Sequence, residues 1–354
     1  MLTPQSQLIL RNQADLTGKV LLIEPMADDL ARELAYADSS LQLFCFTTDK
    51  SVATQWQAQS TAPCYFAADL AATDLAGTDA ASAVVFDTVV LFYPKSKEQL
   101  GITLAQLGAF INADSQIYLV GDNKGGIKSL VSHAEKLGLG AHKLDNAKHC
   151  LWFALNDLAA KPLPKVAMQQ FTCAVPPIGE VNSLKFCSLP GVFNHGKLDA
   201  GTLLLLENVK HIQQGRVLDF ACGAGIVGSY LLKAQPALQL FSSDVSALAV
   251  ASSKATFALN QQQATVLAAD GLPNGTPLFD HIVSNPPFHT GLKTDYSVAQ
   301  KFIDESKAKL SSSGTLTLVA NAHLPYADWL KAAFGNVKEL ARRQGFVVYF
   351  CRKG

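Results

Sequence analysis

The chain has 354 residues, enough for two domains with separate hydrophobic cores. Hydrophobic residues make up 49% and charged residues 16%, a composition typical of soluble globular proteins. No apolar run approaches the roughly 20 residues that span a bilayer, and the first residues lack the basic start and apolar core of a signal peptide. We therefore expect no export signal and no membrane partner.

The net charge is zero, but the two halves carry opposite charge. Residues 1–180 hold 13 Lys and Arg against 18 Asp and Glu, whereas residues 181–354 hold 16 against 11, so the halves carry −5 and +5. A polyanionic partner would therefore meet the second half more easily. The seven cysteines are scattered, with no C-x-x-C pair and no Cys/His cluster. The sequence thus predicts neither a disulfide frame nor a metal site, and it favours the cytoplasm.

The first half alternates predicted strands with predicted helices. Helix-forming composition occurs at Asp28–Ala37 and Leu104–Ile111. Apolar runs predict buried strands at Val20–Ile23, Leu41–Phe46, Asp87–Phe92, Gln116–Val120 and Cys150–Leu155. This alternation predicts a mostly parallel α/β sheet with helices on both faces.

Two proline-rich stretches, Lys161–Pro164 and Val175–Pro177, follow the first half. Hydrophobic periodicity is lost over Asn156–Phe186, so we predict no regular element there. The predicted organisation is one domain at 1–156, a linker at 157–186 and a second domain at 187–354.

The second half repeats the alternation. Predicted helices lie at Leu198–Val209, Ile226–Ala234, Ser246–Asn260 and Val298–Leu310. Predicted strands lie at Arg216–Phe220, Leu238–Phe241, Thr265–Ala268, Asp280–Val283, Thr315–Val319 and Phe346–Cys351.

The two halves share short matches at nearly constant spacing. The tetrapeptide L-Q-L-F occurs at 41–44 and at 238–241, an offset of 197 residues. Phe86-Asp87 matches Phe279-Asp280 at an offset of 193, and the late strands containing Ile117 and Leu316 match at 199. These offsets predict duplication of one domain, the alternative being two unrelated α/β domains of similar rhythm.

A glycine-rich turn follows the first strand of the second half. Gly223 to Gly228 read G-A-G-I-V-G, which fits the G-x-G-x-x-G fingerprint of adenosine-containing cofactors. Asp244 lies 21 residues after Gly223, where that fingerprint places the acid that binds the ribose. The pattern alone leaves open a nicotinamide enzyme or a methyltransferase.

Two further acids favour a methyltransferase. Asp219 lies four residues before Gly223 and suits the ammonium group of a methionine moiety, whereas it would repel a pyrophosphate. Asp270, after the third strand, is placed to accept a hydrogen bond from an adenine amino group. The alternative for each acid is a helix cap or a solvated turn.

The run Ser284–Gly291 reads S-N-P-P-F-H-T-G and follows a predicted strand. Two consecutive prolines end the strand and leave a stiff loop. The Asn285 side chain and the Pro286 carbonyl offer two acceptors, and Phe288 offers a flat face. This set suits a planar base with an exocyclic amine, an arrangement that has no role in hydride transfer. The alternative is a plain turn.

The first half lacks both features at the matching positions. Met26 and Asp28 stand where the second half has its glycines, and residues 92–95 read F-Y-P-K instead of N-P-P-F. We therefore predict that the first copy is degenerate and serves as a scaffold or an RNA-binding domain.

These motifs resemble a known family. D-F-A-C-G-A-G (219–225), Asp244, Asp270 and N-P-P-F occur in the order found in S-adenosylmethionine-dependent methyltransferases that act on planar exocyclic nitrogens. The runs Leu189–Gly201, Asn285–Gly291 and Val319–Tyr326 resemble more closely the bacterial ribosomal RNA small subunit methyltransferase C family. The resemblance covers the second half. It implies two tandem Rossmann-like methyltransferase domains with a degenerate first copy.

The resemblance also implies a reaction, transfer of a methyl group to N2 of a guanine in 16S rRNA of the small ribosomal subunit, at position 1207 in this family. We expect the chain to be a monomer. The implied sites are S-adenosylmethionine binding by Asp219, Gly223, Gly225, Asp244, Asp270 and Asn285, catalysis by Asn285, Pro286 and Phe288, and RNA binding by Phe288, His289 and Lys293. Other candidates for phosphate contacts are Lys301, Arg342, Arg343, Arg352 and Lys353. Ala221 departs from the glycine usual in the family.

Several alternatives remain open on sequence alone. One is methylation of guanine N2 in 23S rRNA by an enzyme of the same two-domain plan. Others are an NAD-dependent oxidoreductase, a binding module without activity, and a methyltransferase that acts on a DNA adenine or a protein glutamine.

Overall fold

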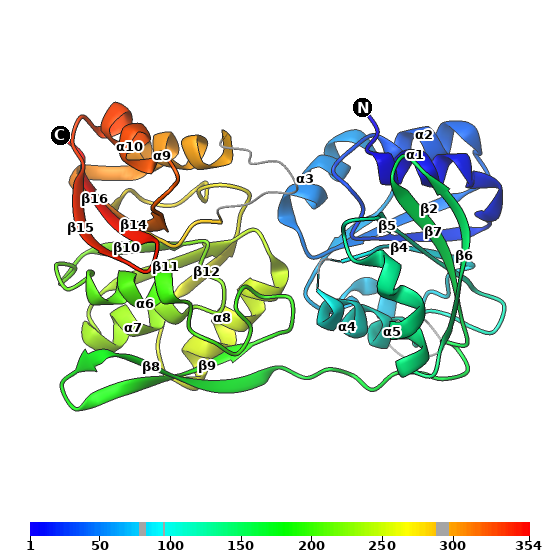
Figure 1. Cartoon of the computed structure of the whole chain (residues 1–354), viewed down its shortest axis with the longest axis horizontal. Helices are drawn as coiled ribbons and strands as arrows, with labels where there is room; N and C mark the ends of the chain where they lie inside the picture. The colour runs from blue at the N-terminus through cyan, green and yellow to red at the C-terminus, as the bar shows by residue number, and fades with distance from the viewer. Residues whose placement is uncertain (78–82, 95, 288–296) are drawn as a thin grey trace. The chain divides into compact units, whose positions relative to one another are not determined.

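The computed structural model in Figure 1 describes residues 1–77, 83–94, 96–287 and 297–354. The chain divides into two compact units, Met1–Ala167 and Met168–Gly354. Each unit is built around a seven-stranded sheet in the part of the chain described. No helix within those ranges is both long and apolar enough to cross a membrane.

The first unit contains seven strands and five α-helices among its described residues. The strands are β1 (Lys19–Ile23), β2 (Gln42–Thr47), β3 (Cys64–Phe66), β4 (Thr88–Phe92), β5 (Gln116–Asp122), β6 (Gly140–Ala147) and β7 (Cys150–Asn156). The α-helices are α1 (Pro4–Arg11), α2 (Leu30–Ala37), α3 (Lys50–Gln59), α4 (Lys97–Leu107) and α5 (Leu130–Lys136). Short 3-10 turns are η1 (Gln13–Asp15), η2 (Leu70–Ala72), η3 (Asp74–Ala76) and η4 (Ile127–Ser129).

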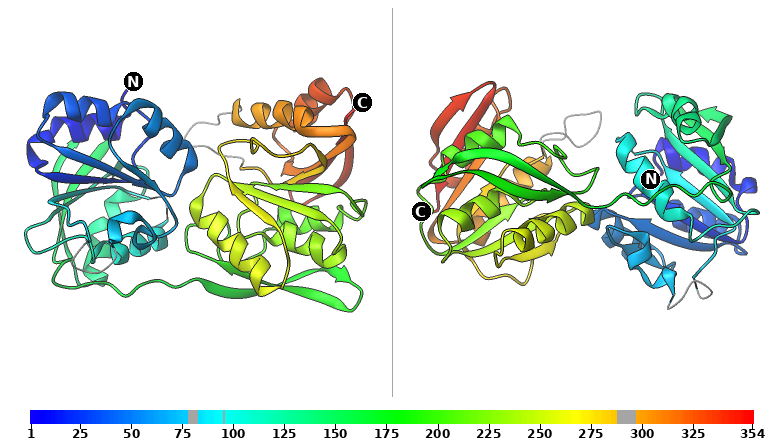
Figure 2. Two further views of the ribbon diagram at one scale, coloured as in Figure 1. Left: turned by 180° about the vertical axis from the view of Figure 1, so that it is seen from behind. Right: turned by 90° about the horizontal axis from the view of Figure 1, so that it is seen from below.

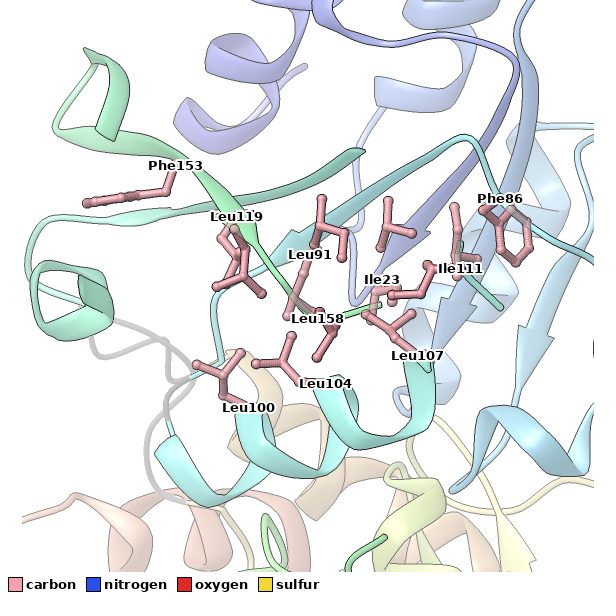
Figure 3. Close-up of a cluster of buried hydrophobic side chains, with 14 of the residues drawn as sticks. Ile23, Phe86, Leu91, Leu100, Leu104, Leu107, Ile111, Leu119, Phe153 and Leu158 are labelled. Carbon is pink, nitrogen blue, oxygen red and sulfur yellow. The ribbon is translucent and has the colours of Figure 1, made fainter. Parts of the chain in front are cut away.

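The first sheet is buried on both faces, as parallel sheets require. Leu21 and Ile23 of β1 belong to a core with α4 and α5, whereas Val20 and Leu22 belong to a core with α1, α2 and α3. In Figure 3, Leu100, Leu104 and Leu107 project from one side of α4 toward the strands. The helix expected at Leu104–Ile111 begins earlier because Ser96 caps it by accepting a hydrogen bond from Gln99 N.

The segment expected to lack regular structure contains a β-hairpin. Strands β8 (Gln169–Ile178) and β9 (Val181–Ser188) pair antiparallel. Strand β9 lies against α8 of the second unit, and β8 contacts α6 and α7 (Figure 2). The expectation of an irregular linker over 157–186 was therefore wrong for this part. Pro176 and Pro177 do not prevent strand pairing here, because they lie at an irregularity of the ladder between Ala174 and Ile178.

The second unit has the remaining elements. Its strands in the main sheet are β10 (Arg216–Phe220), β11 (Gln239–Asp244), β12 (Thr265–Ala268), β13 (Phe279–Ser284), β14 (Leu310–Asn321), β15 (Lys338–Arg343) and β16 (Phe346–Arg352). Its helices are α6 (Ala200–Glu207), α7 (Ile226–Ala234), α8 (Ala247–Leu259), α9 (Ser297–Lys309) and α10 (Tyr326–Phe334). In Figure 1, α9 and α10 cover one face of the sheet and α6, α7 and α8 cover the other.

The two main sheets have the same topology, which confirms the predicted duplication. Their orders are β3-β2-β1-β4-β5-β7-β6 and β12-β11-β10-β13-β14-β16-β15. Val20 pairs with Leu43 and Thr88, and Val217 pairs with Leu240 and His281, so the strand registers repeat at offsets of 197 and 193 residues. The spacings seen in the sequence are those of equivalent strands.

The turn before the central strand is also duplicated. Asp280 Oδ2 accepts a hydrogen bond from Arg216 N at 2.8 Å, and Asp87 Oδ2 accepts one from Lys19 N at 2.7 Å. The residue before each strand is a glycine with positive φ, Gly215 in the second unit at +98°. A Cβ at Gly215 would lie 2.7 Å from Asp280 Oδ2. Glycine is required there by both backbone conformation and space.

We therefore predict that Gly215→Ala lowers the free energy of unfolding more than Gly335→Ala does. Gly335 also has a positive φ, +75°, but a Cβ there would meet nothing within 4 Å, so it controls for backbone strain alone. The excess for Gly215→Ala should be about 1–2 kcal/mol, because the Asp280 hydrogen bond is displaced as well. Urea denaturation measures both variants. Equal losses would contradict this account of the turn.

Candidate active site

Those predicted site residues that the structure describes collect at one edge of the second sheet. Strands β12, β11, β10 and β13 are parallel neighbours, so their carboxyl ends meet at that edge. The glycine loop follows β10, Asp244 ends β11, and Asn285 follows β13. From β10 the chain continues to β11 and β12 on one side and then returns to β13 on the other side of β10. The strand order therefore reverses beside β10, and α/β proteins bind ligands at such a topological switch point.

The glycine loop is open at one glycine and packed at another. A Cβ at Gly223 would meet only Val192 Cγ1, at 4.0 Å, so the loop faces free space there. A Cβ at Gly225 would fall 2.5 Å from Ser253 Oγ, so that glycine lets α8 approach the loop. Ala221 has φ +56°, a conformation that favours glycine, so the departure from the family pattern carries a backbone cost of roughly 1 kcal/mol.

Asp219 lies beneath the start of α7. Its side chain is 1% exposed, and Oδ2 accepts a hydrogen bond from Gly228 N at 2.9 Å. The helix has Gly225 at its N-cap and no side-chain cap of its own, so the carboxylate serves that role from the strand. Burial raises the pKa of Asp219 to about 7, and the nearby Asp244 carboxylate also raises it.

Asp244 and Asp270 lie at the ends of adjacent strands but in different surroundings. Asp244 Oδ2 accepts from Gly223 N and Oδ1 accepts from Ser246 N, each at 2.9 Å, so this side chain ties the glycine loop to α8. Carboxylate oxygens can accept further bonds, which leaves capacity for ribose hydroxyls. Asp270 is exposed two residues beyond β12.

The Asn285 side chain is bound on its nitrogen side only. Nδ2 donates to Asp199 Oδ2 at 3.1 Å and to Thr202 Oγ1 at 2.8 Å. Oδ1 is buried and has no hydrogen-bond partner among the residues described. Pro286 follows and is buried. The other predicted residues of this loop, Phe288, His289 and Lys293, lie outside the described residues.

Sequence reasoning gave no role to Asp199 and Thr202. Asp199 lies in the run Leu189–Gly201, but nothing in that run indicates a contact with Asn285, which is 86 residues away along the chain. A partial signal was present, because an acid three residues before Thr202 at the start of an apolar run is an N-cap pattern. The Asp199 Oδ2 atom does accept from Thr202 N, at 3.0 Å.

Most of the basic residues proposed for phosphate contacts are occupied within the unit. Arg342 pairs with Glu339 at 2.7 Å, Arg343 with Glu207 at 2.9 Å, and Lys301 with Glu305 at 3.7 Å. Lys353 Nζ donates to Leu310 O. Exposed pairs of this kind are weak, so they do not prevent these side chains from binding another anion.

The equivalent edge of the first unit is filled by protein side chains. Glu24 lies 197 residues before Ala221 and has a similar φ of +51°. Its carboxylate is buried, which raises its pKa, and it accepts hydrogen bonds from Thr48 Oγ1 at 2.6 Å and Thr47 Oγ1 at 3.0 Å. Phe92, 193 residues before Asn285, is 5% exposed in the core. The first copy thus presents neither an open glycine loop nor an amide.

The described residues contain no group of three or more His, Cys, Asp or Glu side chains placed to hold a metal ion. What the edge offers is an open turn beside Gly223, carboxylates at three strand ends, and one buried acceptor on Asn285. Such a set can bind a polar adenosine-type ligand and orient a hydrogen-bond donor next to it.

Two family models match the chain in the two units. The model "Methyltransferase small domain N-terminal" matches residues 6–173, and "Methyltransferase small domain" matches residues 183–350. The methyltransferase match therefore extends over both copies of the fold.

Curated relatives match over the full length. The chain is 37% identical to a protein of Pseudoalteromonas translucida and 38% identical to one of Shewanella baltica, with 99% of each chain covered. Both are named ribosomal RNA small subunit methyltransferase C.

A solved structure has the same fold. It is described as the T. thermophilus 16S rRNA N2 G1207 methyltransferase in complex with AdoMet and guanosine. Its TM-score is 0.79 at 21% identity, over 99% of this chain and 92% of that one.

The burial of Asp219 predicts a pH-dependent stability. The folded carboxyl has a pKa of about 7 and the unfolded one about 4, so the folded state binds more protons between these values. The free energy of unfolding should therefore fall as pH rises from 4 to 7. Asp219→Asn removes this dependence while Oδ1 still accepts from Gly228 N.

The variant's advantage over the unmodified chain should grow by about 3 kcal/mol between pH 4 and pH 8. Urea denaturation of both proteins at each pH measures it. Other titrating groups cancel in the difference. A difference that stays constant with pH would show that the carboxyl ionises normally.

Proposed function

Since the chain belongs to the ribosomal RNA small subunit methyltransferase C family, we propose that it methylates N2 of a guanine in 16S rRNA, using S-adenosylmethionine. The observation in the structure that carries this proposal is the buried, unpartnered Oδ1 of Asn285 beside the open glycine loop. The guanine is the one at position 1207, the position named for the T. thermophilus protein. The 23S rRNA alternative is not favoured, because the full-length relatives carry the small-subunit name.

The edge of the second sheet fits S-adenosylmethionine. Gly223 leaves the space that a Cβ would fill, and Asp244 and Asp270 offer acceptors for the ribose and the adenine amine. Asp219, if ionised, would attract the ammonium group through the glycine loop. When bound, this cofactor supplies a methyl group on a sulfonium, which needs no metal and no covalent enzyme intermediate.

The chemical difficulty is the amine of guanine. Its lone pair is delocalised into the ring, so it is a poor nucleophile. Asn285 Oδ1 and the Pro286 carbonyl each accept one of its hydrogens, which favours a pyramidal nitrogen with its lone pair directed out of the base plane. We propose that Phe288, which lies outside the described residues, stacks on the base. As the nitrogen gained the methyl group, the bond from that group to sulfur would break, and the nitrogen would then release one of its two protons to solvent. Catalysis would rest on positioning and on fixed dipoles.

A paired guanine must leave its helix to reach this edge. Unstacking costs a few kcal/mol, which phosphate contacts elsewhere on the chain offset. We assign this binding to the second unit, which carries the positive charge, with support from the first. The protein acts as a cytoplasmic monomer in this proposal.

A complementation experiment tests the proposal. The 16S rRNA of cells that lack this chain should miss one methyl group on a guanine, as mass mapping reports. The unmodified chain should restore it and Asn285→Ala should not, although the purified variant should retain most of its affinity for S-adenosylmethionine, because the other cofactor-binding residues are unchanged.

Asn12→Ala is a matched control. It removes another amide with two hydrogen bonds, to Leu8 O and Asp145 Oδ2, in the first unit. It should restore the methyl group. Normal 16S rRNA in cells without the chain, or full restoration by Asn285→Ala, would refute the assignment.

A further inference from the structure

The nitrogen side of the Asn285 amide is fixed by the start of α6. Asp199 is the N-cap of this helix, and its Oδ2 accepts both Thr202 N at 3.0 Å and Asn285 Nδ2 at 3.1 Å. Thr202 Oγ1 accepts a second hydrogen bond from Asn285 Nδ2 at 2.8 Å. Both amide hydrogens are therefore used, and both acceptors come from one helical turn. Thr202 is only 9% exposed, so water does not compete for its hydroxyl.

This contact selects one of the two orientations that an asparagine amide can take. An ionised carboxylate accepts hydrogen bonds and donates none. If the amide turned over, Asn285 Oδ1 would face Asp199 Oδ2 and the two oxygens would repel each other. Oδ1 is therefore held on the opposite side, where it is buried and meets no donor among the described residues.

We propose that Asp199 and Thr202 are positioning residues for methyl transfer, which orient and polarise the Asn285 amide so that Oδ1 receives the substrate amine. This inference rests on the function proposed above. A buried acceptor without a partner is costly. The amine's N–H removes that cost, so the site favours a ligand that donates at this point.

The charge of Asp199 adds to the effect of geometry. Donation of Nδ2–H to a carboxylate shifts electron density toward Oδ1, and hydrogen bonds in such a chain strengthen one another. The guanine nitrogen gains positive charge as its new bond to carbon forms. A fixed anion one side chain away stabilises that charge more than it stabilises the neutral amine.

The sequence around Asp199 is explained by this contact. Gly201 leaves room for the carboxylate, because a Cβ there would lie 2.9 Å from Asp199 Oδ2 and 2.9 Å from Phe346 Cδ1. In the first unit, α1 occupies the place of α6, with Thr3 and Ser6 located 196 residues before Asp199 and Thr202. Thr3 Oγ1 donates to Ser6 Oγ there, at 3.1 Å. The first unit therefore has a similarly capped helix, but Phe92 stands at the position that matches Asn285, so no side-chain amide is oriented there.

Thr202→Val and Thr202→Ser test the role of the hydroxyl. Thr202→Val removes the acceptor at nearly constant shape and should lower kcat about tenfold, the effect of one such hydrogen bond. The KM for the RNA substrate, the affinity for S-adenosylmethionine and the urea midpoint should change little. Thr202→Ser keeps the hydroxyl and should recover most of the lost turnover. The substrate is small ribosomal subunits from cells that lack this chain.

Thr103→Val is the matched control. Thr103 is also 9% exposed in a helix, and its hydroxyl donates to Gln99 O in the first unit. Its kcat should equal that of the unmodified chain. The inference is overturned if Thr202→Val keeps its kcat within twofold, or if Thr202→Ser loses as much as Thr202→Val. Failure of the unmodified chain to methylate these subunits would instead refute the proposed function.

Exchanging the amide and the carboxylate between positions 285 and 199 provides an independent test, which does not require Thr202→Val to fold. Asn285→Asp places two carboxylates in contact and should lower kcat more than a hundredfold. Adding Asp199→Asn restores a donor, since the new amide nitrogen can donate to residue 285 while its oxygen still accepts Thr202 N. The double variant should be at least tenfold more active than Asn285→Asp alone. No recovery would overturn the inference, because it would show that the two side chains do not act on each other.

Discussion

The proposed site depends on the Asn285 side-chain amide, whose Nδ2 donates two hydrogen bonds and whose Oδ1 accepts none from the described residues. The Asn285 nitrogen is held by a carboxylate and a hydroxyl at the start of α6, which in our proposal leaves the oxygen to meet the substrate. Everything else at this edge of the sheet supports that arrangement. Pro286 and Pro287 end the strand directly after Asn285, and β13 places Asn285 beside the glycine loop that follows β10.

Comparison of the two units shows that the same strand order and register can carry different side chains at the strand ends. Both units have the same strand order, the same registers and the same glycine-to-aspartate turn before the central strand. They differ in the side chains above the strand ends. In the first unit the Glu24 carboxylate bonds to Thr47 and Thr48, and Phe92 lies in the core where the second unit has Asn285. Stability of the fold therefore does not require the ligand-binding features, and they could be lost from one copy without losing the sheet.

Much of this was predictable from local pattern. The bounds of β10, α7 and β12 agree with those expected. Gly215 precedes β10, and Gly225 and Gln235 lie on either side of α7. The contacts that orient Asn285 were not predictable, since they join residues 83 and 86 positions apart and depend on how α6 packs. The hairpin of β8 and β9 was missed because its prolines fall at an irregular part of the ladder. The roles of all the predicted site residues in binding and catalysis stay predictions. These residues are Asp219, Gly223, Gly225, Asp244, Asp270, Asn285, Pro286, Phe288, His289 and Lys293.

A crystal structure of the chain grown with S-adenosylmethionine tests the central claim most directly. We predict one cofactor per chain, against Gly223, with its methyl group facing the side on which Asn285 Oδ1 lies and with the contacts to Asp199 and Thr202 intact. A cofactor bound over Glu24 in the first unit, or an Asn285 amide turned so that its nitrogen faces the methyl group, would contradict the account.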